Sequence, residues 1–216
     1  IALAARGARV GCLDLDHRQR TLGRYLDNRG ETIKRTGRDL PMPRYETHDG
    51  ESNDLFSESL ERLGTGCDFL IIDTPGRDDK FGRIAITNAD TLVTPMNDSF
   101  VDFDLIGHVD PDTFKVVRPS FYSELIWDSR KRRAKADGAT IDWVVLRNRM
   151  QHIEARNMKR VSEAIDQLAK RVGFRVIPGL SERVIYRELF PKGLTMLDAR
   201  EFGQMGLAHV AARQEL

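Results

Sequence analysis

The sequence has little cysteine, almost no net charge and no long apolar run. Only Cys12 and Cys67 occur, far apart and outside any CxxC, which argues against a disulfide framework and against an iron–sulfur or zinc site. No apolar run approaches the roughly 20 residues of a membrane span, and no signal peptide opens the chain. Lys and Arg number 34 and Asp and Glu 33, which argues against a histone-like partner but permits a local basic patch. We therefore expect a cytoplasmic protein that does not enter a membrane.

Short, nearly continuous apolar runs recur along the chain, which is typical of buried parallel strands with helices between them. Four runs stand out and a fifth is weaker, at residues 8–13, 69–72, 91–94, 143–146 and 174–177. Helical periodicity is clearest at residues 53–63 and 153–172. The pattern predicts an α/β fold with a mainly parallel sheet flanked by helices on both faces. The length fits a single domain over residues 1–216, with residues 28–50 as a long exposed excursion.

The chain begins in an unusual place for a domain. Residues 1–10 have the pattern of the end of an amphipathic helix, a stop at Gly7 and the beginning of a strand. We therefore expect that this sequence is a fragment and that an N-terminal element precedes Ile1 in a longer protein.

Acidic residues follow the first two apolar runs, at the strand ends where open α/β sheets bind their ligands. Asp14 and Asp16 follow the first run, and Asp73 ends the second just before a Thr-Pro-Gly turn. This second arrangement is a Walker B pattern, in which the carboxylate holds Mg²⁺, usually through water. The alternatives are that Asp73 caps the next helix and that Asp14 makes a structural hydrogen bond. Asp16, expected on the same strand face as Asp14 but further out, is the better candidate to orient an attacking water.

The order of these motifs resembles the ParA/MinD group of deviant Walker ATPases, which are P-loop NTPases of the SIMIBI type. Within that group, three longer stretches are similar to the branch that places the bacterial division site by inhibiting FtsZ away from midcell, at residues 94–107, 142–150 and 183–198. Shorter matches lie at residues 14–21 and 169–174. The resemblance covers nearly the whole chain.

The resemblance implies a role for each matching residue. Asp16 matches the aspartate that supports hydrolysis, and Asp73 matches the Walker B aspartate of the Mg²⁺ site. Asn148, with Arg149 after it, matches the position that reads adenine, and an amide suits this task because it offers both a donor and an acceptor. Pro178 and the loop after it match the segment that closes over the base. Without the family, an asparagine after a strand is more often a turn residue.

The sequence contains no phosphate loop of the form KGGxGKST, although the resemblance implies one before Ile1. The backbone N–H groups of such a loop cradle phosphates, its second lysine reaches the β- and γ-oxygens, and its hydroxyl holds Mg²⁺. Its first lysine, in this family, reaches the nucleotide of the partner subunit. We therefore expect this polypeptide alone neither to hydrolyse ATP nor to dimerise on it, and the missing first strand to leave sheet edges exposed.

Basic residues lie opposite the apolar stripe of the helix expected at residues 153–172. Arg156, Lys159 and Arg160 are the candidates for non-specific DNA contact that the resemblance implies, and Lys170 and Arg171 belong to the same face. Such contact goes through phosphates and weakens steeply with salt. The alternative is an ordinary solvated helix face.

The resemblance implies an ATP- and Mg²⁺-dependent switch. ATP would promote a homodimer, the dimer would bind DNA non-specifically, and hydrolysis would return it to monomers. ParB would be the source of a gradient and FtsZ its target, in a cytoplasmic, nucleoid-associated protein. Two alternatives stay open: a ParA-type chromosome or plasmid segregation ATPase, and a non-catalytic binding module that has lost the nucleotide.

Overall fold

A computed structural model describes residues 1–48, 52–97, 99–150, 155–198, 212 and 214–215, without the side chains of residues 155–158. The chain forms two compact units. The first unit contains Ile1–Ala85 and Arg183–Gln214, and the second contains Ile86–Glu182 with the last two residues.

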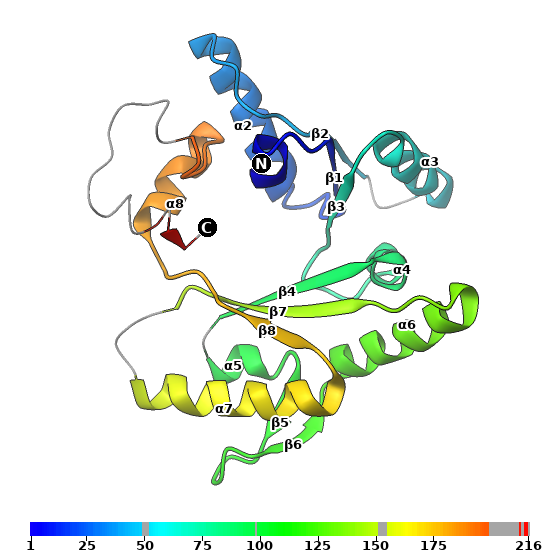
Figure 1. Ribbon diagram of the computed structural model, residues 1–216, viewed down its shortest axis with the longest axis vertical. Helices are drawn as coiled ribbons and strands as arrows, with labels where there is room; N and C mark the ends of the chain where they lie inside the picture. The colour runs from blue at the N-terminus through cyan, green and yellow to red at the C-terminus, as the bar shows by residue number, and fades with distance from the viewer. Residues whose placement is uncertain (49–51, 98, 151–154, 199–211, 213, 216) are drawn as a thin grey trace. The chain divides into compact units, whose positions relative to one another are not determined.

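The first unit is built on a three-stranded parallel sheet in the order β2-β1-β3 (Figure 1). Its strands are β1 (Val10–Asp14), β2 (Arg44–Thr47) and β3 (Phe69–Asp73). Its helices are α1 (Ala2–Ala5), α2 (Thr21–Thr36), α3 (Asn53–Gly64), the first part of α4 (Lys80–Asn88), α8 (Val184–Leu189) and the 3₁₀ helix η1 (Phe190–Lys192).

Strand β1 is buried along its whole length because helices cover both of its faces. Val10 and Cys12 pack with Leu26 of α2, whereas Leu13 packs with Phe56 of α3 and with α4. A strand alternates its side chains between two faces, so two helical layers are needed to bury consecutive apolar residues. The continuous apolar run of β1 is therefore explained by its position between these layers.

The second unit contains a three-stranded parallel sheet in the order β4-β7-β8 and a two-stranded antiparallel hairpin. The sheet strands are β4 (Thr91–Asn97), β7 (Asp142–Asn148) and β8 (Arg175–Ile177). The hairpin strands are β5 (Gly107–Val109) and β6 (Val116–Pro119), and the helices are α5 (Phe100–Phe103), α6 (Phe121–Asp137) and α7 (Ala155–Val172).

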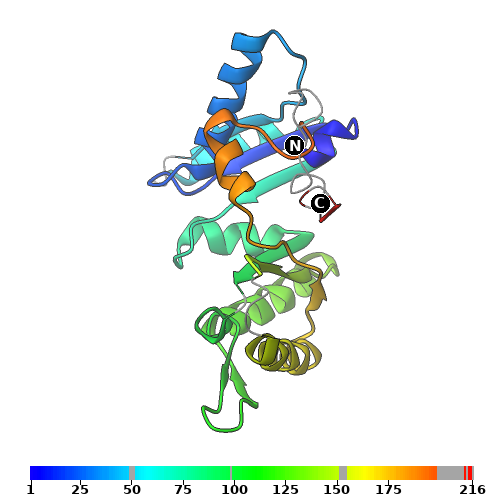
Figure 2. The same cartoon turned by 90° about the vertical axis from the view of Figure 1, so that its left-hand side faces the viewer.

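Helices α5, α6 and α7 lie on one face of this second sheet, as Figures 1 and 2 show. Val161, Ile165 and Leu168 of α7 join Trp143 of β7 and Phe103 of α5 in one hydrophobic core. The predicted 3.6-residue stripe of α7 is thus the face that it buries. The rest of α7 is left for charged residues.

The fold class predicted from the sequence is confirmed: five strands correspond to the predicted apolar runs, and both main sheets are parallel. The prediction of a long excursion over residues 28–50 is wrong, because α2 continues to Thr36 and β2 follows it. The hydrophobic pattern did not indicate helix α2, because two of its buried positions, Arg29 and Thr32, are polar. A hydrophobic stripe cannot reveal a helix that buries polar side chains.

Strands β3 and β4 each end their sheet, and no described strand pairs with their outer edges. On β3 the side chains of Phe69 and Ile71 are 46% and 42% exposed, and on β4 that of Val93 is 50% exposed. These apolar edges agree with the expectation of exposed sheet edges. The missing strand itself stays a prediction.

Candidate nucleotide-binding site

Asp14 ends β1 and is buried, with only 1% of its surface exposed. Its Oδ1 accepts a hydrogen bond from the N–H of Asp16 at 2.9 Å, and its Oδ2 accepts one from the N–H of Gly23 at 2.9 Å. A buried carboxylate needs such donors to compensate for its lost hydration. Asp14 therefore ties the loop after β1 to the first turn of α2, which supports the structural alternative for this residue.

Asp16 lies in the loop between β1 and α2, so the prediction that it shares a strand face with Asp14 is wrong. Its side chain is half-buried, and its Oδ1 accepts the N–H of Gln19 at 3.2 Å. The described part of the chain offers no donor to Oδ2. The carbonyl of Asp16 accepts the N–H of Arg20 at 2.7 Å, so the loop is fixed while one carboxylate oxygen stays available.

Asp73 ends β3 directly beside Asp14, its partner in the parallel register of β1 and β3. The N–H of Leu15 donates to the Asp73 carbonyl at 2.8 Å. Asp73 is not the cap of the next helix, because Asp79 accepts the N–H of Gly82 at 2.8 Å and performs that task. The Asp73 carboxylate has no hydrogen bond from a described residue and projects from the carboxyl end of the sheet.

The pKa of Asp73 is raised above its ordinary value. The largest cause is the loss of hydration from nearby protein atoms, although the side chain is exposed, and the charges of Asp14 and Asp16 act in the same direction. Crowded negative charge of this kind favours the binding of a cation.

The carboxylate of Asp73 fits a Mg²⁺ site in which water and phosphate oxygens are the other ligands. Among the described residues, no group of three or more His, Cys, Asp or Glu side chains is arranged to hold a metal ion. Mg²⁺ needs no such group, because it keeps several waters and is often bound by one or two carboxylates together with phosphate oxygens. Of the two paired aspartates at the strand ends, Asp73 is the suitable one, since both oxygens of Asp14 already accept backbone N–H groups.

The predicted base-reading residues lie in the second unit. Asn148 is the last residue of β7 and is half-buried, and no described residue hydrogen-bonds its amide. Arg149 is exposed and has a φ of 51°, a left-handed conformation that is uncommon outside glycine. Such strain persists only where neighbouring structure enforces it.

Backbone hydrogen bonds on both sides of Asn148 provide that enforcement. The N–H of Leu180 donates to the Arg147 carbonyl at 3.0 Å, and the N–H of Met150 donates to the Leu180 carbonyl at 3.1 Å. The loop after Pro178 is thus joined to the end of β7. Sequence reasoning missed Gly179, where a Cβ would lie 1.9 Å from the Arg147 carbonyl oxygen, so only glycine fits. A glycine directly after proline was the available signal.

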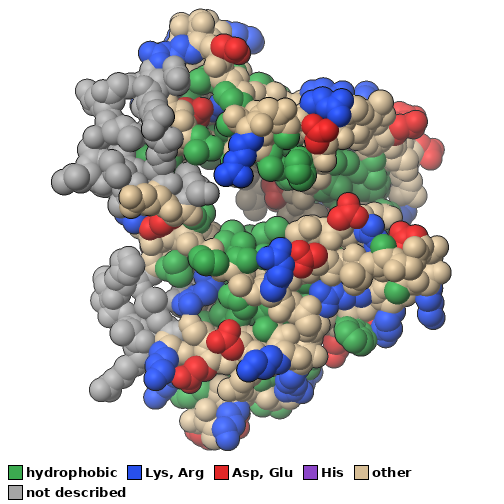
Figure 3. All heavy atoms as spheres, in the orientation of Figure 1, with side chains coloured by type: hydrophobic (Ala, Val, Ile, Leu, Met, Phe, Trp, Pro, Cys, Tyr) green, Lys and Arg blue, Asp and Glu red, His purple; other side chains and the backbone are tan. Residues whose placement is uncertain are grey.

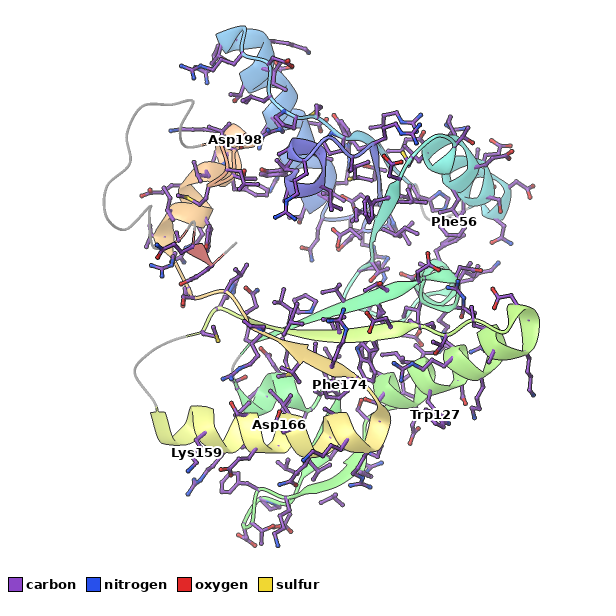
Figure 4. The ribbon with its side chains drawn as sticks, viewed as in Figure 1. Phe56, Trp127, Lys159, Asp166, Phe174 and Asp198 are labelled. Carbon is purple, nitrogen blue, oxygen red and sulfur yellow. The ribbon has the colours of Figure 1, made fainter. Side chains whose placement is uncertain are left out.

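The basic residues of α7 differ in their surroundings. Lys159 and Arg160 are exposed, whereas the side chain of Arg156 lies outside the described residues. The Nζ of Lys159 is 4.0 Å from Glu163, and Figure 4 labels Lys159 on this helix. Arg171 donates to the carbonyls of Val116 and Val117 in the hairpin. Figure 3 shows basic side chains interspersed with acidic ones over α7 and the hairpin, so the face is mixed in charge.

The two tryptophans of the chain differ in burial. Trp143 is fully buried, whereas Trp127 is 52% exposed on α6 (Figure 4). Within the described residues, none of the helices combines the length and the apolar character that crossing a membrane requires.

The fold is shared with solved ATPases of the ParA/MinD class. MinD in the MinC:MinD cell division complex of Aquifex aeolicus matches with a TM-score of 0.53 and 15% identity, covering 99% of this chain and 85% of that chain. Apo McdA of Cyanthece matches with a TM-score of 0.60 and 16% identity, covering 99% of this chain and 90% of that chain. The family described as ATPase MipZ matches residues 1–216. The chain therefore belongs to the MipZ family of ATPases. No curated protein sequence matches it significantly.

Proposed function

We propose that this chain carries the water-orienting, metal-holding and base-reading residues of an ATP-driven dimerisation switch that positions the bacterial division site by regulating FtsZ. Hydrolysis of ATP would return the dimer to monomers. The observation that carries the proposal is the pairing of Asp14 with Asp73 at the carboxyl ends of β1 and β3, in a chain that matches the MipZ family over its whole length.

Each residue has a role that its surroundings support. Asp16 would orient the attacking water through its available carboxylate oxygen, because Asp14 and Gln19 fix its loop. Asp73 would hold Mg²⁺ through water, and the ion would neutralise phosphate charge. The amide of Asn148 would meet the edge of adenine, with Arg149 and the loop after Pro178 beside the base.

The proposed partners are those that the family resemblance implies. The ATP-bound homodimer would bind nucleoid DNA without sequence preference through Arg156, Lys159 and Arg160, and ParB and FtsZ would be its protein partners. The solved MinD is in a complex with another division protein, MinC, which supports a division protein as the target. Slow hydrolysis would set the lifetime of the dimer, because the output is a conformational state.

The nucleotide part of the proposal is tested by comparing this chain with a chimera. The 216 residues contain no phosphate loop, so we expect no ATP turnover from the chain alone. A chimera in which a strand and a KGGxGKST loop precede Ile1 should turn over ATP and dimerise on it. Asp16→Ala should abolish its turnover, while Asp112→Ala, which changes an exposed acid of the hairpin, should not.

Two results would contradict this part. One is turnover by the unmodified chain that Asp16→Ala abolishes. The other is a folded chimera that binds ATP but keeps its activity when Asp16 is replaced. Co-sedimentation of the ATP-loaded chimera with FtsZ polymers tests the target. Its absence, together with DNA-dependent segregation activity, would favour the ParA-type alternative.

A further inference from the structure

The tip of the β5–β6 hairpin is built around a phenylalanine in an unusual conformation. Phe114 has a φ of 56°, in the left-handed region that bulky residues rarely adopt. Asp110 stabilises the turn: its Oδ1 accepts the N–H and hydroxyl of Thr113, each at 2.8 Å, and its carbonyl accepts the N–H of Phe114 at 2.9 Å. The turn therefore fixes where the Phe114 ring lies.

The Phe114 ring lies between the core and α7. On one side its centroid is 5.1 Å from that of Phe100 in α5, which packs against the hydrophobic core. The Cζ of Arg160 lies over the ring, 4.6 Å from its centroid. A guanidinium at this distance is held by a cation–π interaction. No described residue accepts a hydrogen bond from it, so its N–H groups remain available at its edges.

A stacked guanidinium is well prepared to bind phosphate. Arginine presents N–H donors in a planar fork that matches two phosphate oxygens, and stacking on an aromatic ring uses the face of that plane rather than its edge. The ring therefore orders a long side chain before the phosphate arrives. Arg160 keeps its N–H donors while the stacking favours one orientation of its guanidinium.

Lys159 and Arg171 of the same helix lack this arrangement. Arg171 donates hydrogen bonds to the Val116 and Val117 carbonyls, and these bonds join β6 to the end of α7. Among the described residues, Lys159 has only a long contact with Glu163, and its stem is flexible. Arg160 is thus the one of these three that is both oriented and available.

We propose that Phe114 is a positioning residue for phosphate binding: it orients Arg160 toward the backbone of nucleic acid, while Arg171 holds the hairpin and does not bind phosphate. The proposal deepens the DNA contact proposed above and rests on it. It adds a residue of the hairpin to a surface that charge alone would confine to α7.

The test is the affinity of the ATP-loaded chimera described above, with each substitution made in it, for a mixed-sequence DNA duplex of about 20 base pairs, measured by fluorescence anisotropy at several salt concentrations. Arg160→Gln removes one phosphate contact from each subunit of the dimer, so the slope of log affinity against log salt should become shallower by about 1.8, or about 0.9 for each contact. Phe114→Leu removes only the ring, so affinity should fall about two- to fivefold with the slope nearly unchanged. Phe114→Tyr keeps the ring and should bind like wild type.

Arg171→Gln is the matched control for loosening of the hairpin. It should increase hydrogen exchange over residues 107–119 and leave both affinity and slope unchanged. The proposal is overturned if Phe114→Leu binds like wild type, or if Arg171→Gln loses as much affinity as Phe114→Leu. If wild type binds but Phe114→Leu does not differ from it, the DNA contact stands and this inference fails. If the ATP-loaded chimera without further substitution does not bind the duplex even at low salt, both are overturned.

Discussion

At the residue scale, Asp14 and Asp73 show how two paired aspartates can have different tasks. Asp14 is buried and gives both oxygens to backbone N–H groups of Asp16 and Gly23, so it fixes the loop that carries Asp16. No described residue donates a hydrogen bond to the Asp73 carboxylate, which lies in the field of two further carboxylates. Asp14 therefore stabilises the loop of the site, whereas ionised Asp73 adds negative charge that no cation in the described structure balances.

This difference predicts an effect of pH on stability. The raised pKa of Asp73 means that the folded chain binds this proton more tightly than the unfolded chain, whose pKa is near 3.8. Ionised Asp73 therefore lowers stability, and the loss develops as pH rises from about 3.8 to the folded pKa and persists above it. We expect Asp73→Asn to raise the thermal unfolding midpoint at about pH 7 and to bring no gain at about pH 3.

Circular dichroism melts over a pH series measure this effect. Asp68→Asn is the control with the opposite sign, because hydrogen bonds from Arg9 lower the pKa of Asp68 to about 2. Asp68→Asn should therefore lower the midpoint at neutral pH. A midpoint that Asp73→Asn leaves unchanged at neutral pH would contradict the crowding of charge at the site.

A second prediction concerns Gly179. A Cβ at this position would lie 1.9 Å from the Arg147 carbonyl oxygen. Gly179→Ala must therefore displace the loop or break the hydrogen bond from the Leu180 N–H to the Arg147 carbonyl. We expect a loss of about 1–3 kcal/mol in the free energy of unfolding, measured by urea denaturation. Gly64→Ala, where nothing lies within 4 Å of the added Cβ, should be neutral or slightly stabilising. Equal effects of the two substitutions would contradict the close approach.

At the element scale, α2 is fixed by the C-terminal segment that packs along it. Asn28 donates to the Phe190 carbonyl at 3.2 Å, and Thr32 donates to the Lys192 carbonyl at 2.8 Å. Between them, the fully buried guanidinium of Arg29 makes two hydrogen bonds to the Asp198 carboxylate, at 2.9 and 2.8 Å. In the first turn of the same helix, the N–H of Gly23 donates to Asp14, which holds the loop of Asp16. The packing of α2 against the C-terminal segment therefore supports that loop.

Breaking the Arg29–Asp198 pair should be costly. Burial opposes the ionisation of Asp198, but hydrogen bonds from Arg29 and Thr195 hold its pKa below the ordinary value. Arg29→Met and Asp198→Leu each leave a buried charge without its partner and should cost about 3–5 kcal/mol in the free energy of unfolding. The double variant leaves no unpaired charge and should cost clearly less than the sum, which urea denaturation of all four proteins measures.

The control and the pH dependence make this cycle specific. Glu31→Gln removes the exposed Glu31–Lys34 pair of the same helix and should leave stability unchanged. The contribution of ionised Asp198 is present above about pH 4 and is lost as pH falls through its lowered pKa, so Asp198→Asn and wild type should converge in acid. Additive single effects at neutral pH would show that the pair does not act as a unit.

At the scale of the whole molecule, exposed strand edges coincide with a net charge of only +1. Unpaired strands template the pairing of other chains, and so small a charge gives little repulsion to oppose it. Ile71, on the outer strand β3, is 42% exposed and is a suitable site for the test. The prediction is self-association that a charge on this strand suppresses.

We expect Ile71→Lys to reduce light scattering during incubation at high concentration, compared with wild type. Leu55→Lys is the matched control, because Leu55 is similarly exposed at 46% but lies on helix α3 rather than on a strand. Both variants add the same charge, so a difference between them reports the strand and not the charge. Equal suppression by the two would contradict association through β3.

The sequence by itself determined the class of fold, most strand positions and the acidic residues at the strand ends. These features depend on local pattern, because buried parallel strands need continuous apolar runs and chemistry follows their carboxyl ends. Only the tertiary structure decided that Asp14 accepts hydrogen bonds from backbone N–H groups, that α2 buries Arg29, and that Phe114 lies beneath Arg160. Each of these depends on partners distant in sequence, and the composition of a segment carries no information about which distant groups will contact it.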